Sequence, residues 1–350
     1  MDPEAAFTAN EYYFEQGWAD GLPVIPPTPE RLQAFLATTD RAPDEVLWRM
    51  EALGRECTVE LAAINAILAG CRPEYFPVVL AAFEAVVDEG APAIGAWQST
   101  TGGAPMLIVN GPVRQKLGFN ARGNVFGPGF RANATVGRAI RLIIANVFGL
   151  KPHELDQATQ GTPGRYTLCI AENEEESPWE PLHVQLGYRP EDSVVSALHI
   201  RSCDFVDNRH TEDPEAILFD LVDTVCRTGV LVRPQQWAIL VMGPEHAQQL
   251  ARRGYSKRDV QQYVYEHAGH RVAELAKVGK DGIEEPIRFT RPATPEEQAA
   301  TAPDTWRPYL ASPDHVLVVV AGANNGGVST VVQPFSNRRK FPGTALVQSR

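Results

Sequence analysis

Cysteine is scarce in this sequence and is not arranged as a scaffold. The 350 residues contain five cysteines: Cys57, Cys71, Cys169, Cys203 and Cys226. No two of them form a Cys-x-x-Cys pair, and their number is odd. A disulfide framework is therefore not expected in a chain of this length, and the spacing matches no zinc signature. We predict a reducing compartment and no metal site.

The chain also lacks an excess of basic residues. Its 32 Lys and Arg are outnumbered by 43 Asp and Glu, which gives a net charge of -11. This balance argues against binding to nucleic acid or to an anionic membrane surface. No apolar run approaches the length of a membrane span, and the acidic start Met1-Asp2-Pro3-Glu4 lacks the basic-then-apolar pattern of a signal peptide. We expect a cytoplasmic protein that binds no nucleic acid and no membrane.

The common nucleotide-binding motifs are absent as well. A glycine-rich loop, Gly322 to Thr330, follows the apolar run Val316 to Ala321. It lacks the Gly-Lys-Ser/Thr ending of a P-loop, and its glycine spacing is not that of a dinucleotide-binding turn. A strand followed by a glycine loop is nevertheless a position at which α/β proteins bind ligands. The sequence therefore leaves the cofactor undetermined.

What the chain does have is the composition of a folded protein, with 44% hydrophobic and 21% charged residues. Strand patterns such as Val194 to Ile200 and Trp237 to Met242 alternate with helical patterns in the second half. We predict an α/β protein of two domains or lobes. The domains are residues 1–190, with a proline arm and glycine-rich turns, and residues 191–350, with a mostly parallel sheet flanked by helices and a basic tail.

A glycine-rich turn leads into a helix at residues 124–138. Gly127 and Gly129 permit backbone angles that other residues resist. The helix predicted to start at Arg131 places its free N–H groups and its positive dipole end beside this turn. Arg131, Thr135 and Arg138 fall at i, i+4 and i+7 and share one face. The arrangement has the form of an anion site, although a plain tight turn with solvent-facing arginines gives the same pattern.

Two more glycine-rich turns occupy residues 99–105 and 158–164. We expect the three turns to lie in one domain and to converge on a pocket. The predicted substrate-binding residues are Arg72, Thr100, Thr101, Gly127, Gly129, Arg131, Asn133, Thr135 and Arg138.

Cys71 lies between two predicted helices, residues 58–69 and 73–87. The positive start of the second helix and the neighbouring Arg72 would both lower the pKa of the thiol and favour a nucleophilic thiolate. The alternative is that Cys71 is a small hydrophobic residue filling the junction between the helices.

Carboxylates and a histidine follow the short strand predicted from Tyr166 to Ala171. Glu172 and Glu174 share one side if the strand continues through them. His183 titrates near neutrality and is a candidate acid or base. We predict that Glu172, Glu174 and His183 move protons and that Cys71 is a candidate nucleophile. A solvated run of carboxylates and an exposed histidine are the alternatives.

Several stretches resemble a known family. They are the arm Gln16 to Thr28, the junction Ala69 to Pro77, Ile108-Val109-Asn110-Gly111-Pro112, the turn Gly127 to Arg138, and the segments Ala158 to Gly164 and Glu172 to His183. Over about residues 12–200 the chain is similar to bacterial proteins of the UGSC-type, selenoprotein-linked family, which is related to components of glycine/sarcosine/betaine reductase. The Gly-Ser-Cys motif behind that family's redox label is absent here. If a thiol role were inherited, it would fall to Cys71.

Three functions follow from these patterns. The first is an enzyme acting on a small anionic metabolite that carries a carboxylate or phosphate, of the lyase, hydrolase or thiol-dependent reductase type. The second is a non-catalytic binding or assembly subunit of a reductase system. The third is a metal-dependent enzyme that uses histidines and carboxylates. Because long proline arms often reach a second subunit, we also expect a homo-oligomer, by default a homodimer.

Overall fold

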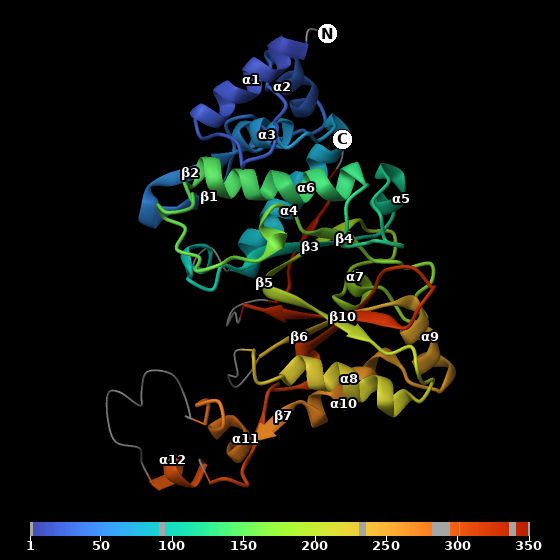
Figure 1. The fold of residues 1–350 in the computed structure, drawn as a ribbon. Coiled ribbons are helices and arrows are strands. Elements are labelled where there is room, and N and C mark those ends of the chain that lie inside the picture. Colours follow the sequence, from blue (N-terminus) through green and yellow to red (C-terminus); the bar gives the residue numbers. More distant parts are fainter. Residues whose placement is uncertain are drawn as a thin grey trace. The chain divides into compact units, whose positions relative to one another are not determined.

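The fold is that of a mixed α/β protein, seen in a computed structural model (Figure 1). The structure describes residues 3–90, 95–230, 236–281, 295–300, 302–335 and 341–348. The contacts between residues divide the chain into two compact units. Unit 1 comprises Met1–Glu174, Glu180–Arg201 and Asn337–Arg350, and unit 2 comprises Glu175–Trp179 and Ser202–Ser336. These units do not coincide with the predicted domains 1–190 and 191–350.

Unit 1 is formed mainly by the first half of the chain. Its helices are α1 (Pro3–Glu15), α2 (Pro29–Leu36), α3 (Val59–Leu68), α4 (Phe76–Glu89), α5 (Val113–Leu117), α6 (Arg131–Leu142) and α7 (Leu182–Gln185). Short 3-10 turns lie at η1 (Glu51–Leu53), η2 (Pro73–Tyr75), η4 (Ala96–Gln98) and η6 (Pro163–Arg165), and a π-helical turn at η5 (Ile143–Val147). Its strands are β1 (Val46–Met50), β2 (Arg55–Thr58), β3 (Ala104–Asn110), β4 (Cys169–Ala171), the first part of β5 (Val194–Asp207), and β11 (Gly343–Leu346).

The sheet of unit 1 is centred on β3. Every residue of β3 is buried, which explains its nearly continuous apolar sequence. β3 pairs parallel with β4, with Leu107 opposite Cys169, and antiparallel with β5, with Ala104 opposite Ile200 and Asn110 opposite Val194. β11 adds antiparallel to β5. The described part of the C-terminal segment, expected to be a basic tail, is therefore a strand of this sheet.

Helices α3, α4 and α6 pack together within the main hydrophobic core of unit 1. α3 begins at the N-cap Thr58, whose side chain accepts from the Leu61 N–H at 3.2 Å. α6 starts at Arg131 as predicted, without a side-chain cap, and continues through the π-helical turn η5. Gly149 then follows at φ +71°, a conformation that suits the end of a helix.

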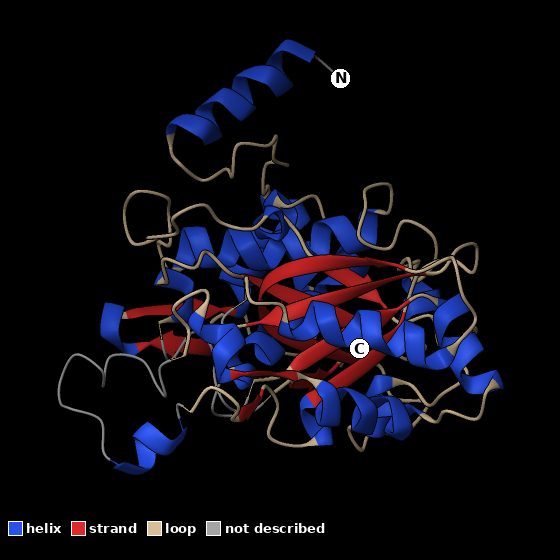
Figure 2. Ribbon diagram, turned by 60° about the horizontal axis from the view of Figure 1, so that its bottom comes forward, coloured by secondary structure: helices blue, strands red, loops and turns tan. Residues whose placement is uncertain are grey.

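Unit 2 has its own core and a mixed sheet. Its helices are α8 (Pro214–Cys226), α9 (Pro244–Arg252), α10 (Lys257–His267), α11 (Val272–Ala276) and α12 (Pro295–Ala300), with a 3-10 turn η8 (Pro313–His315). Its strands are β6 (Ala238–Met242), β7 (Gly269–Arg271), β8 (Trp306–Pro308), β9 (Val316–Val320) and β10 (Val328–Pro334), together with the last part of β5. Figure 2 shows the strands and the surrounding helices.

The prediction of a mostly parallel C-terminal sheet is wrong. β6 and β9 are parallel, but β10 pairs antiparallel with β6, and β7 pairs antiparallel with β8. Only the short loop 321–327 joins β9 to β10. A parallel return needs a crossover of roughly a dozen residues or more, so a loop of this length reverses the chain instead.

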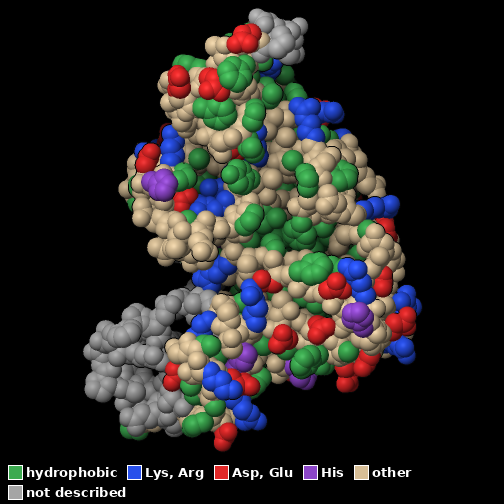
Figure 3. Space-filling model, in the orientation of Figure 1, with side chains coloured by type: hydrophobic (Ala, Val, Ile, Leu, Met, Phe, Trp, Pro, Cys, Tyr) green, Lys and Arg blue, Asp and Glu red, His purple; other side chains and the backbone are tan. Residues whose placement is uncertain are grey.

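On the face drawn in Figure 3, basic and acidic side chains are interspersed. Among the residues that the structure describes, no helix has the length and apolar character needed to cross a membrane.

Candidate functional site

Two of the three glycine-rich turns meet in unit 1. The Thr159 N–H donates to the Thr100 carbonyl at 2.9 Å, and the Thr162 N–H donates to the Gly102 carbonyl at 3.1 Å. A side chain at Gly102 would lie 2.6 Å from the Gly161 Cα, so glycine is required for this approach. Thr100 and Thr101, predicted to bind substrate, are exposed residues of the first turn.

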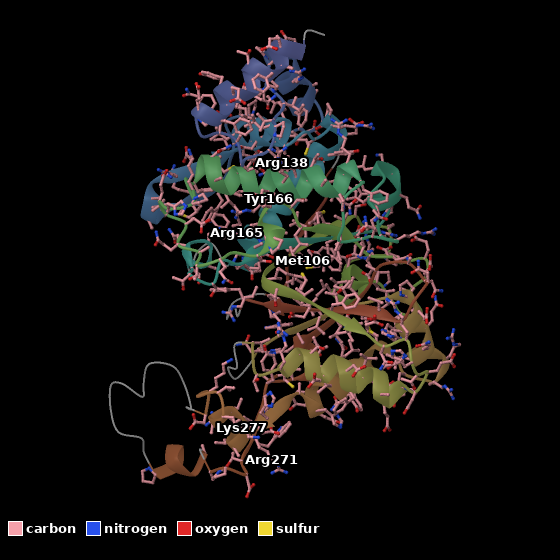
Figure 4. All side chains as sticks on the ribbon, viewed as in Figure 1. Met106, Arg138, Arg165, Tyr166, Arg271 and Lys277 are labelled. Atoms are coloured by element: carbon pink, nitrogen blue, oxygen red, sulfur yellow. The ribbon has the colours of Figure 1, made fainter. Side chains whose placement is uncertain are left out.

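Basic side chains gather around this pair of turns, and we call Arg141, Arg165, His199 and Arg201 the basic cluster. Arg165, labelled in Figure 4, ends η6 directly after the second turn. A Cβ at Gly161 would lie 3.1 Å from the Arg165 Cδ. The Arg141 Nε on α6 donates to the Arg165 carbonyl at 2.8 Å. His199 on β5 lies against Gly103, because a Cβ there would be 2.8 Å from the imidazole Nε2. Arg201 follows on the same strand.

The charges of the basic cluster act on one another. Burial, and then repulsion by Arg141, Arg165 and Arg201, lowers the pKa of His199 to about 3, so its imidazole is neutral at pH 7. Burial and the neighbouring Arg165 also lower the pKa of Arg141, to about 10. The carboxylate of Asp156 forms an ion pair with Arg165. Three guanidinium groups that act on one buried imidazole create a positive field, which favours an anion.

At the anion site predicted on α6, both arginines form hydrogen bonds with groups of the chain itself. The Arg138 guanidinium donates to both carboxylate oxygens of Asp20, from Nε at 2.9 Å and from Nη2 at 2.6 Å, and also to the Leu22 carbonyl. The Arg131 Nε donates to the Gly70 carbonyl at 3.0 Å. The proline arm thus supplies the carboxylate that was expected from a ligand.

Other predicted binding residues stabilise the fold around α6. Asn133 is buried; it accepts from the Asn120 N–H and donates to the carbonyls of Asn120 and Cys169. The Thr135 hydroxyl donates to the Arg131 carbonyl at 2.8 Å. In the turn before α6, the Gly127 N–H donates to the Asn124 carbonyl, so this amide already has a hydrogen-bond partner. Gly129 is needed there for its φ of +119°.

Cys71 lies at the junction after α3 as predicted, but its thiol does not favour the thiolate. Burial raises its pKa to about 12. A hydrogen bond with Thr135 and the charges of Arg131 and Arg138 act in the opposite direction and are weaker. Arg72 is exposed and is the N-cap residue of η2. The expectation of a lowered pKa failed because a helix start and a nearby arginine do not offset complete desolvation.

Alkylation of the folded protein should therefore leave Cys71 nearly unmodified at pH 8. With a pKa of about 12, roughly one thiol in ten thousand is ionised at that pH. Mass spectrometry after iodoacetamide treatment measures the modified fraction, and the urea-unfolded chain is the control. Rapid modification of Cys71 in the folded state would contradict the buried, protonated thiol.

The predicted proton-transfer residues Glu172, Glu174 and His183 do come together, with two partners that the sequence analysis missed. We call Asn110, Arg114, Glu172, Glu174 and His183 the carboxylate cluster. Asn110 Nδ2 donates to Glu172 at 2.6 Å and to Glu174 at 3.0 Å, while Arg114 pairs with Glu174 at 2.8 Å. His183 Nδ1 lies 3.9 Å from Glu174.

The carboxylate cluster links β3, α5 and α7 through hydrogen bonds and an ion pair. Glu172 also accepts from the Leu182 N–H at the start of α7, and Arg114 Nη1 donates to the Glu172 carbonyl. Asn110, Glu172 and His183 are fully buried. The signal for Asn110 was present in the sequence: it is a polar residue that ends an apolar strand and precedes Gly111-Pro112.

The two clusters lie at opposite ends of β3. The basic cluster is at the Ala104–Ile200 end and the carboxylate cluster at the Asn110–Val194 end. Six residue steps at about 3.3 Å each separate these ends by about 20 Å. A small metabolite bound at the basic cluster is therefore out of reach of Glu172 and Glu174.

Within the part of the chain that the structure describes, no group of three or more His, Cys, Asp or Glu side chains is placed to hold a metal ion. No protein-family model matches this sequence, and a search of curated proteins finds no match either.

Proposed function

We propose that the protein is an enzyme that binds a small carboxylate- or phosphate-bearing metabolite at the basic cluster of unit 1. One observation carries the proposal: Arg141, Arg165 and Arg201 all act electrostatically on the buried His199 beside two interlocked glycine turns. Like charges held together at a partly buried position repel, and a bound anion relieves that repulsion. Arginine forks also match carboxylate and phosphate geometry.

In this proposal the chain's groups have separate roles. Arg141 and Arg165 hold the anionic group, and the turn that contains Gly102 and Gly103 brings its backbone close to the ligand. His199, neutral at pH 7, donates or accepts a hydrogen bond at the reacting part of the substrate. The protonated thiol of Cys71 supports a lyase or hydrolase more than a thiol-dependent reductase. Membership of the UGSC-type family and a cytoplasmic location belong to the same proposal.

Anion binding tests the proposal directly. Inorganic phosphate and malonate, added at constant ionic strength, should raise the Tm of the full chain in differential scanning fluorimetry. A ligand at about 100 times its Kd stabilises the folded state by about 2.7 kcal/mol. In the double variant Asp156→Asn/Arg165→Gln, which removes the ion pair without leaving Asp156 uncompensated, we expect the affinity to fall about 10- to 150-fold.

The matched control is Arg131→Gln, which removes an exposed arginine of α6 outside the basic cluster and should leave phosphate affinity unchanged. If Arg131→Gln abolished binding while the double variant retained it, the anion would bind at the start of α6 and the basic cluster would be the wrong site. A substrate is then recognised among the bound anions as one whose turnover is lost in His199→Gln while its binding is kept.

A further inference from the structure

Helix α1 and the turn after it expose four aromatic side chains, which we call the aromatic arm: Phe7, Tyr12, Phe14 and Trp18. Phe7 is 61% exposed and Trp18 is 43% exposed. Tyr12 packs edge-on against Trp18, with ring centroids 6.1 Å apart. Of the α1 residues whose burial the structure describes, none is buried, and Figure 2 shows α1 standing apart from the other helices. An isolated helix of 13 residues is marginal in water. α1 is held to unit 1 by Tyr13, which packs against the core, and by Asn10, whose side chain accepts from the Val24 N–H. A partner that covers its exposed aromatic side chains would stabilise it further.

The aromatic arm is acidic. α1 contains Glu4, Glu11 and Glu15 and no lysine or arginine. The tip of the molecule in Figure 3 accordingly shows apolar and acidic side chains next to each other. A partner for this surface must offer apolar contacts together with positive charge.

The same chain carries exposed side chains of that kind from α5 to the first residue of α6, and we call them the basic loop: Lys116, Arg122, Phe126, Phe130 and Arg131. All five residues are exposed. The stretch 113–131 contains no aspartate or glutamate. The basic loop therefore offers two exposed aromatic rings in a stretch whose charged residues are all positive, which complements the aromatic arm in both respects.

We propose that the aromatic arm of one protomer docks on the basic loop of a second copy of this chain. Two reciprocal contacts of this kind close a twofold dimer. If each arm buries about half the surface of four aromatic side chains, it covers roughly 400 Å². Four such surfaces, two arms and two loops, sum to roughly 1,600 Å², the size of a standard stable interface.

Sedimentation velocity of the full chain at micromolar concentration tests the dimer through charge exchange. Wild type should sediment as a dimer. Glu11→Lys/Glu15→Lys and Lys116→Glu/Arg122→Glu should each weaken dimerisation at least tenfold, because each places like charges opposite one another. The quadruple variant, which restores opposite charges, should recover the dimer. Because all four residues are exposed, circular dichroism should show every variant folded.

Two controls from unit 2 separate docking from general surface effects. Phe219→Ser removes an aromatic side chain that is as exposed as Phe7, and Lys277→Glu reverses an exposed charge. Both should remain dimeric. A monomeric wild type, or a quadruple variant no more dimeric than the two doubles, would overturn the proposal, and so would dimers that persist in both double variants. None of these outcomes depends on anion binding at the basic cluster.

Discussion

Replacing Arg114 with methionine should lower the free energy of unfolding by about 3–5 kcal/mol. The Arg114 side chain is 5% exposed and forms an ion pair with Glu174. It also donates to the carbonyls of Gly111 and Glu172, and so joins the end of β3 to the segment that follows β4. Methionine fills similar space but leaves Glu172 and Glu174 without this buried cation. Urea unfolding of the full chain, monitored by circular dichroism, measures the change.

Two variants test whether the burial of Arg114 causes the loss of stability expected for Arg114→Met. Arg49→Met removes an arginine from an exposed pair with Glu56 and should cost less than about 1 kcal/mol. Arg114→Met/Glu174→Leu removes both partners of the buried pair and should be more stable than Arg114→Met alone, since one uncompensated charge is gone. Equal losses for Arg49→Met and Arg114→Met would show that the carboxylate cluster does not act as a buried network.

Replacing Gly102 with alanine should both destabilise the protein and abolish its stabilisation by phosphate. Gly102 has a φ of +68°, and the added Cβ would lie 2.6 Å from the Gly161 Cα and 2.8 Å from the Gly161 N. Backbone strain contributes about 1–2 kcal/mol, and separating the two turns adds about 1–3 kcal/mol. Because Arg165 and His199 each contact one of these turns, the basic cluster opens when the turns separate.

Gly118→Ala is the matched control for Gly102→Ala. Gly118 has nearly the same φ, +71°, but a Cβ there would meet nothing within 4 Å. It should show the loss due to strain alone and an unchanged response to phosphate. If Gly102→Ala kept the full Tm increase with phosphate, the contact between the turns would not be needed for the anion site.

The carboxylate cluster shows how far residue type alone predicts a site. Glu172, Glu174 and His183 were selected because they titrate, and they do meet. Their bonds are to Asn110 of β3, Arg114 of α5 and Leu182 of α7. Asn110 and Arg114 precede these glutamates by about 60 residues, and no sequence pattern reveals contacts over that separation. The sequence therefore could not show whether Glu172, Glu174 and His183 transfer protons or form a structural network.

At the predicted anion site on α6, the local geometry was predicted correctly but the partner of the arginine was not. The spacing of Arg131, Thr135 and Arg138 on one face of α6 is correct, because helical periodicity is a local property. Arg138 nevertheless binds Asp20, which lies 118 residues earlier in the chain. The arginines of the basic cluster, Arg141, Arg165 and Arg201, come from a helix, a turn and a strand that no spacing rule connects.

By itself, the sequence determined the local properties of this protein: the helix from Arg131, the glycines that permit tight turns, the apolar strand β3 and the α/β character of the fold. These follow from backbone geometry and hydrophobic periodicity, which act over a few residues. Only the tertiary structure decided which charges are compensated, which thiol is desolvated and which turns meet. Burial and Coulomb energies depend on distances through space, and residues far apart along the chain set those distances.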